Sequence, residues 1–198
     1  MINAEYREVD KRKIALSDAE LSARLGRIVT HTDPELERVT QTVLQTAEPK
    51  YAVTRVKLSY PTDSSVDLGF ATVESTALVR NLRGSHEAFL FVVTLGAAVD
   101  RMLARLSATS RAEAFIFDAV ASALAEAACD VADAEIRGSL ACRPRFSPGY
   151  ADFDISHQPA LLDFLGAPTH LGVCVSESFL MTPMKTITAV MGICHDPV

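Results

Sequence analysis

The chain has 198 residues, of which 48% are hydrophobic and 22% charged, and its formal net charge at pH 7 is −6. This length and apolar content favour one folded domain over a disordered chain, and the scattered lysines and arginines argue against nucleic acid as a partner. The longest apolar run, Ala88 to Val93, is far shorter than the ~20 residues of a membrane span, and the N-terminal residues lack the apolar centre of a signal peptide, so we expect a cytoplasmic location.

The predicted elements begin with two helices. Ser17 and Glu20 form a capping box, in which a hydroxyl and a carboxylate satisfy free amides at the start of a helix that runs to about Leu25. The dipeptide at 33–34, Asp-Pro, opens a second helix, because aspartate accepts from free amides and proline fits the first helical position. Pro49 ends it.

The next segments alternate between strands and one helix. Period-two alternation from Tyr51 to Tyr60 predicts a half-buried strand. A turn follows, residues 66–72 predict further strand, and Ser75 caps a helix that ends at Gly84. The apolar run from Ala88 to Thr94 predicts a buried strand.

The longest predicted helix lies in the second half of the chain. A helix after Gly96 precedes a second capping box, Ser110 and Glu113, which starts a helix that runs to about Arg137 and ends at Gly138. Its many alanines favour helix and let a neighbouring backbone or a ligand approach closely.

A loop and short elements complete the chain. Residues 143–157 hold two prolines and a glycine without periodicity, which is typical of a functional loop. After it we expect a helix near Leu161–Leu165 and strands near Leu171–Val175 and Thr186–Cys194. We therefore predict an α+β fold, a single compact domain over residues 1–198, with helices packed on an antiparallel or mixed sheet.

No spacing of cysteine or histidine predicts a metal site. The four cysteines form no Cys-x-x-Cys pair and have no histidine at zinc spacing. In a cytosolic chain they are expected to be small buried residues rather than disulfides. They are Cys129, Cys142, Cys174 and Cys194.

The best site candidate read from the residues alone is the loop Arg145–Tyr150. Arg145 offers a fork of donors suited to a carboxylate or phosphate, Pro148 and Gly149 shape a turn, and Tyr150 is an aromatic with a polar tip. Such a loop suits a small polar ligand. The alternative is a plain turn with Arg145 solvated and Tyr150 packed on the core.

A second candidate is Glu126, which is the only charged residue between Ala119 and Cys129 and would suit a cationic ligand. The alternative is a solvated helix face, because polar residues recur there every four positions. These are Asp118, Ser122, Glu126 and Asp130. A third candidate segment, residues 176–186, could line a pocket or only connect two elements, since it holds no nucleophile with a visible base.

Two segments together resemble the activation domain of cobalamin-dependent methionine synthase, in its short stand-alone form. They are Arg145-Phe146-Ser147-Pro148-Gly149-Tyr150 and Ser176-Glu177-Ser178 with Met181, Pro183 and Lys185-Thr186. The resemblance is best over Glu126 to Gly192, within a motif-bearing part of about 110–198, and it implies that family's α+β fold.

The resemblance also implies a ligand, S-adenosylmethionine. In that family the arginine meets the ligand's carboxylate, the Pro-Gly-Tyr backbone lies against the ligand, and a glutamate of the preceding helix contacts it. Carried over to this chain, the expected binding residues are Glu126, Arg145, Ser147, Pro148, Gly149, Tyr150 and Ser178.

The implied function is reactivation, by reductive remethylation, of a corrinoid protein in methionine biosynthesis, within a cobalamin-dependent methyltransferase system. The chain lacks the cobalamin motif Asp-x-His-x-x-Gly, so cobalamin must arrive on a partner that docks over Tyr150 and residues 178–185, with a flavodoxin-like protein as electron donor. Two alternatives stay open. A docking module without ligand use is favoured by the absence of tryptophan and by Val190-Met191-Gly192 where the large enzyme has aromatics; a small enzyme would need an acid, base or nucleophile that is not evident.

Overall fold

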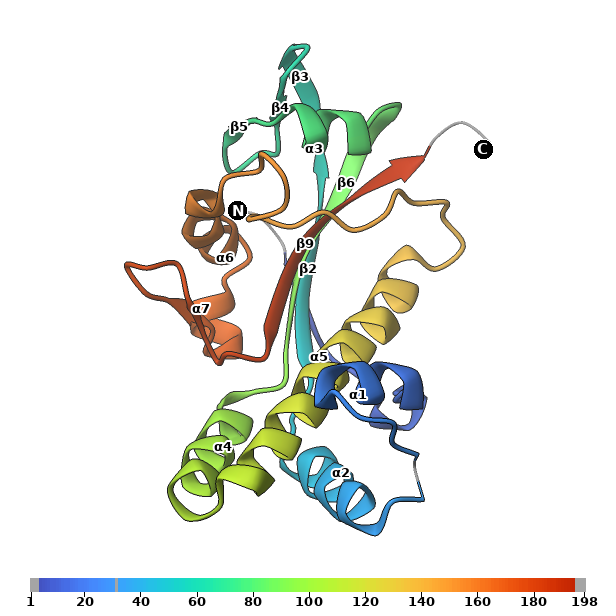
Figure 1. The fold of residues 1–198 in the computed structure, drawn as a ribbon. Coiled ribbons are helices and arrows are strands. Elements are labelled where there is room, and N and C mark those ends of the chain that lie inside the picture. The colour runs from blue at the N-terminus through green and yellow to red at the C-terminus, as the bar shows by residue number, and fades with distance from the viewer. Residues whose placement is uncertain (1–3, 31, 195–198) are drawn as a thin grey trace.

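A four-stranded antiparallel sheet runs through the middle of the molecule (Figure 1). The computed structural model describes residues 4–30 and 32–194, so the first residues of the segment searched for a signal peptide lie outside it. Every neighbouring pair of strands in this sheet is antiparallel. In spatial order the strands are β1 (Glu5–Glu8), β2 (Lys50–Lys57), β6 (Ser85–Thr94) and β9 (Thr186–Cys194).

Helices cover one face of this sheet. They are α1 (Asp18–Leu25), α2 (Pro34–Thr46), α4 (Ala97–Thr109) and α5 (Arg111–Arg137). Side chains alternate along a strand, so Phe91 and Val93 of β6 face the helices and pack with Val120 and Leu124 of α5. Among the described residues, no helix combines the length and the apolar content that a membrane span requires.

Smaller elements cover the opposite face, where Leu90 and Val92 of β6 pack with Phe153 and Leu161. A three-stranded sheet and a helix stand at one end, with two helices and a two-stranded hairpin beside them (Figure 1). These are β3 (Ser59–Thr62), β4 (Ser65–Asp67), β5 (Thr72–Glu74), α3 (Thr76–Asn81), α6 (Gln158–Phe164), α7 (Ala167–Leu171), β7 (Cys174–Val175) and β8 (Met181–Thr182), with 3-10 turns η1 (Lys11–Lys13) and η2 (Ile155–His157). The α+β prediction with an antiparallel sheet is confirmed.

Two local predictions were wrong, and one strand was missed. The strand expected over 51–60 ends at Lys57, because the chain passes at Ser59 into a different sheet. The strand expected over 171–175 shrinks to two residues after helix α7. Strand β1 was not predicted, because its exposed, largely charged sequence shows no apolar alternation.

The two predicted capping boxes differ in the structure. The Ser110 hydroxyl accepts from the Glu113 amide at 3.3 Å, and the Glu113 carboxylate bonds Arg38 instead of reaching back. Ser17 occupies the N-cap position of α1 without a side-chain cap bond. Of these two serines, only Ser110 therefore caps its helix through a side-chain hydrogen bond.

Replacing Ser110 by alanine is expected to lower the free energy of unfolding by about 1 kcal/mol, the usual value of an N-cap hydroxyl. Ser17→Ala is the matched control, since its hydroxyl makes no cap bond, and we expect a smaller loss. Urea denaturation of both variants measures the difference. Equal losses would contradict the assignment of Ser110 as the cap.

Candidate functional site

The loop after α5 is fixed along β9 by hydrogen bonds. The backbones of Phe146 and Val190 exchange two bonds, of 2.9 and 2.8 Å, and the Arg143 amide donates to the Gly192 carbonyl at 2.8 Å. The Ser147 hydroxyl donates to the Thr188 carbonyl at 2.6 Å and is buried. The loop is therefore rigidly placed, and Ser147 acts here as an anchor to the sheet.

The Pro-Gly-Tyr turn presents one aromatic ring to solvent. Gly149 has φ of +93°, its amide donates to the Phe153 carbonyl at 2.7 Å, and an added Cβ would lie 3.2 Å from the Ile155 side chain. Glycine is needed there, because other residues rarely adopt this φ. Pro148 is buried, whereas Tyr150 is 56% exposed and its ring lies edge-on to Phe146. The alternative in which Tyr150 packs into the core is wrong.

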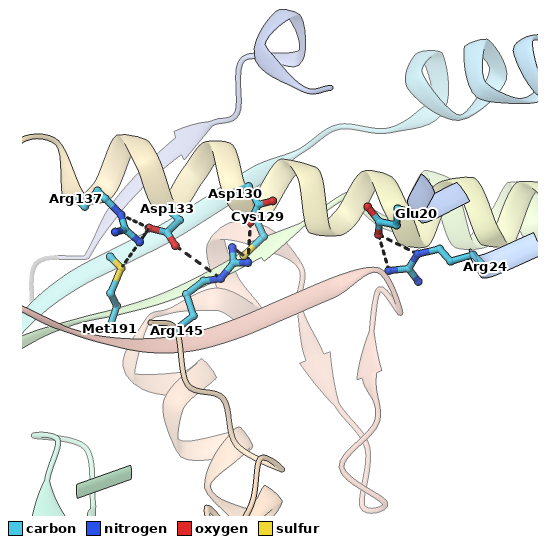
Figure 2. A network of polar contacts seen from close by, with 8 residues as sticks. All are labelled: Glu20, Arg24, Cys129, Asp130, Asp133, Arg137, Arg145 and Met191. Atoms are coloured by element: carbon cyan, nitrogen blue, oxygen red, sulfur yellow. Dashed lines mark hydrogen bonds and ion pairs between the residues drawn. The ribbon is translucent and has the colours of Figure 1, made fainter. Parts of the chain in front are cut away.

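Arg145 extends from this loop to α5 (Figure 2). Its terminal nitrogens donate to Cys129 Sγ at 3.0 Å and to Asp130 Oδ1 at 2.7 Å, and its Nε lies 3.7 Å from Asp133 Oδ2. The side chain is 24% exposed, so the alternative of a freely solvated arginine is also wrong. Because a guanidinium has five donors, further N–H groups remain for a ligand.

Burial raises the pKa of the Cys129 thiol to about 12, and the nearby Arg145 charge acts in the opposite direction. The thiol is therefore protonated at neutral pH and accepts an Arg145 N–H through its sulfur. A buried protonated thiol is a poor nucleophile. Cys129 thus serves Arg145 as a buried hydrogen-bond acceptor.

Asp133 links two arginines beneath the loop. It is only 8% exposed, accepts from Arg137 Nε at 2.6 Å and lies within ion-pair distance of Arg145 (Figure 2). Arg137 also donates to Met191 Sδ of β9 at 3.6 Å. Sequence reasoning missed Asp133; the available signal was its four-residue spacing from Arg137, which pairs side chains on a helix.

Glu126 lies on α5 one turn before Asp130 and is exposed. Within residues 4–30 and 32–194, it makes no hydrogen bond or ion pair. Two other polar residues of the same helix face have a partner. The ammonium of Lys185, the residue before β9, donates to Asp118 at 2.7 Å and to Ser122 at 2.8 Å. The face is therefore not simply solvated: Glu126 is an open carboxylate between two bound cations, Lys185 and Arg145.

Ser178 is exposed in the β7–β8 hairpin, and its hydroxyl lies 2.9 Å from that of Ser176. In the described part of the chain no hydrogen bond joins it to the Arg145 loop. The base of the hairpin is tied to β9 by buried Gln158, which contacts Met181 and Thr188. The structure thus brings Arg145 and Asp130 together, places Glu126 one turn away, and leaves Ser178 on a separate element.

Potential metal ligands do not gather: residues 4–30 and 32–194 contain no group of three or more, and His31 and His195 lie outside that range. The four cysteines are free thiols. Cys129 is buried as expected, but Cys174 is exposed, so the expectation that all four are buried was wrong.

Asp152 lies just after the Pro-Gly-Tyr turn and links it to α3, because its carboxylate accepts hydrogen bonds from the N-terminal amides of that helix. Its carboxylate accepts from the Ser75 hydroxyl and from the amides of Thr76 at 2.9 Å and Ala77 at 3.1 Å. These bonds, led by the one from Ser75, hold the pKa of Asp152 below its ordinary value of 3.8. Because the folded-state pKa is the lower one, this stabilisation is present above about pH 4 and is lost as the pH falls through the folded-state pKa.

Replacing Asp152 by asparagine is expected to lower the urea midpoint at pH 7, and the deficit should shrink as the pH is lowered from 5 toward 2. Asp163→Asn on α6 is the control, since its exposed side chain makes no hydrogen bond in the described structure. Urea titrations across this pH range measure both. A deficit that stays constant down to pH 2 would contradict the linkage.

Comparison with known proteins gives a likeness of fold. No protein-family model and no curated protein matches the sequence. Among solved structures, a crystal structure of the MetH reactivation domain bound to AdoHcy superposes with a TM-score of 0.70, covering 100% of this chain and 80% of that chain at 14% identity. The chain therefore has the fold of the methionine synthase reactivation domain, as the two motif segments predicted.

Proposed function

We propose that the protein binds S-adenosylmethionine and supports the reductive remethylation of a cobalamin-carrying protein in trans. The similar solved domain is bound to AdoHcy, S-adenosylhomocysteine, which is what remains of S-adenosylmethionine once its methyl group has been transferred. The observation that carries the proposal is the position of Arg145. Its guanidinium is bonded to Asp130, one helical turn from the exposed carboxylate of Glu126.

The residues present fit the two ends of this ligand. Its carboxylate suits the remaining donors of Arg145, since guanidinium and carboxylate form charge-assisted, often paired, hydrogen bonds. Its cationic sulfonium suits Glu126, which makes no ion pair in the described structure. The turn at Pro148, Gly149 and Tyr150 lies on the same loop, where backbone without a Cβ at Gly149 lets a ligand approach closely. When bound, S-adenosylmethionine supplies the methyl group; the chain holds and orients it.

We propose that a partner brings the methyl acceptor; the 198 residues themselves contain no cobalamin-binding motif. We place the docking surface over Tyr150 and residues 178–185, where Leu180 is 69% exposed and Met184 57% exposed. Exposed apolar side chains in a polar surround are typical of a contact surface. The proposal also includes a flavodoxin-like protein as electron donor, a cytoplasmic location and a single domain over residues 1–198.

A second candidate is a docking module that no longer uses the ligand. One observation favours it: Val190, Met191 and Gly192 stand in β9 where the large enzyme has aromatic residues, and all three are buried. Gly192 leaves no room for a larger residue, since an added Cβ would lie 2.6 Å from Ser85 Oγ.

Calorimetric titration of the purified chain with S-adenosylmethionine separates the two candidates. Saturable binding, with S-adenosylhomocysteine binding as well, supports the first. A coupled assay then measures the return of activity in an inactivated cobalamin-dependent methionine synthase that lacks its own reactivation domain, given a flavodoxin-type reductant. Association with that enzyme without ligand binding would favour the docking module, and neither association nor ligand binding would overturn both candidates.

A further inference from the structure

A cleft lies beside α3, whose Leu78 packs on the face of the sheet opposite α5. It has a volume of about 580 Å³ and is lined by side chains of β3, of α3 with the turn that follows it, and of β6. This volume falls in the usual range for small-molecule sites. The lining includes Tyr60, Thr76, Val79, Arg80, Arg83 and His86.

One side of this cleft is cationic although the chain as a whole is acidic, with a net charge of −6. Arg80 and Arg83 are exposed, and within the described residues neither guanidinium has a carboxylate partner. Arg143 adds a third charge close by, because its guanidinium donates to the Arg83 carbonyl and lies against Gly84. Among the described lining residues, Asp63 is the one carboxylate. The excess positive charge is therefore available to an anion.

The facing wall is apolar and fixed. The Tyr60 hydroxyl lies 3.0 Å from the Leu82 carbonyl and 2.8 Å from the Ser85 carbonyl, which holds the ring at the cleft with 37% of the residue exposed. Val79 lines the same space. An aromatic ring held by its hydroxyl offers a flat surface for stacking.

We propose that this cleft binds a small organic phosphate, with Arg80 and Arg83 on the phosphate and Tyr60 against the organic part. Guanidinium groups match phosphate oxygens in pairs of hydrogen bonds, and the Thr76 hydroxyl is a further donor in the lining. The site is independent of the S-adenosylmethionine proposal, since Arg145 contacts α5 on the other face of the sheet.

The test is a calorimetric titration with uridine monophosphate, beside uridine and inorganic phosphate. Uridine monophosphate is the probe because its pyrimidine does not mimic the adenosyl group of the other ligand. The variant is Arg80→Gln with Arg83→Gln. The matched control is Arg101→Gln with Arg105→Gln, which removes the same charge from two exposed arginines of α4 without an ion pair in the described residues.

We expect saturable binding of uridine monophosphate, weaker binding of phosphate, and none of uridine. The cleft variant should lose at least about tenfold in affinity, because charged hydrogen bonds are removed, while the α4 control and Arg145→Ala should stay within about twofold of the wild type. No binding of uridine monophosphate at millimolar concentration, or an equal loss in the α4 control, would overturn the proposal. So would binding of uridine as tight as that of its phosphate.

Discussion

Replacing Arg145 by alanine is expected to weaken S-adenosylmethionine binding by about 1.5–3 kcal/mol, a loss of about 10- to 150-fold in affinity. The expected loss comes from charged hydrogen bonds between the guanidinium and the ligand's carboxylate. The variant also leaves Asp130 without its cation, which adds negative charge near the carboxylate end of the ligand. Calorimetry at fixed ionic strength measures the change.

Two further variants make this result specific. Arg145→Lys keeps the charge but removes the planar fork of donors, so it should restore only part of the affinity. Arg101→Ala on α4 removes an exposed arginine far along the chain from the loop and should leave affinity unchanged. Wild-type affinity in Arg145→Ala, with folding verified by circular dichroism, would remove Arg145 from the site and favour the docking module.

The main elements of the site were predictable because their signals are local. An alanine-rich run with a capping serine predicts α5, and two prolines and a glycine within fifteen residues predict a loop after it. Short elements were less predictable. Helix α7 and the two-residue strands β7 and β8 depend on packing against the hydrophobic cluster on the sheet face opposite α5. A segment of five residues or fewer carries no periodicity that would predict such packing.

Contacts between α5 and the loop that follows it were the least predictable part of the site. Their four-residue spacing assigned Glu126 and Asp130 to one solvated helix face. In the structure the loop after α5 runs back along β9, so Arg145 reaches Asp130, whereas Glu126 stays without a partner in the described residues. Asp133 escaped attention because it lies among buried alanines of α5, where periodicity predicts an apolar residue. A carboxylate at such a position needs a partner, which is how a buried charge points to a site.

Asp133→Ala is expected to lower the free energy of unfolding by about 1–3 kcal/mol, because both arginines lose their shared carboxylate. Removing one partner of a fully buried ion pair costs about 3–5 kcal/mol; the lower range applies here because the Arg137 and Arg145 side chains are 35% and 24% exposed and reach water. Urea denaturation at pH 7 measures the loss.

Asp130→Ala is the matched control for Asp133, since it removes a carboxylate from the same arginine at the surface. The Asp130 side chain is 68% exposed, and exposed ion pairs contribute about 0–1 kcal/mol, so its cost should be clearly smaller. If Asp133 holds Arg145 for the ligand, Asp133→Ala should also weaken S-adenosylmethionine binding, at a temperature where the variant is fully folded. A stability loss without any change in affinity would make Asp133 a purely structural residue and leave the placement of Arg145 to the bonds of its loop with β9.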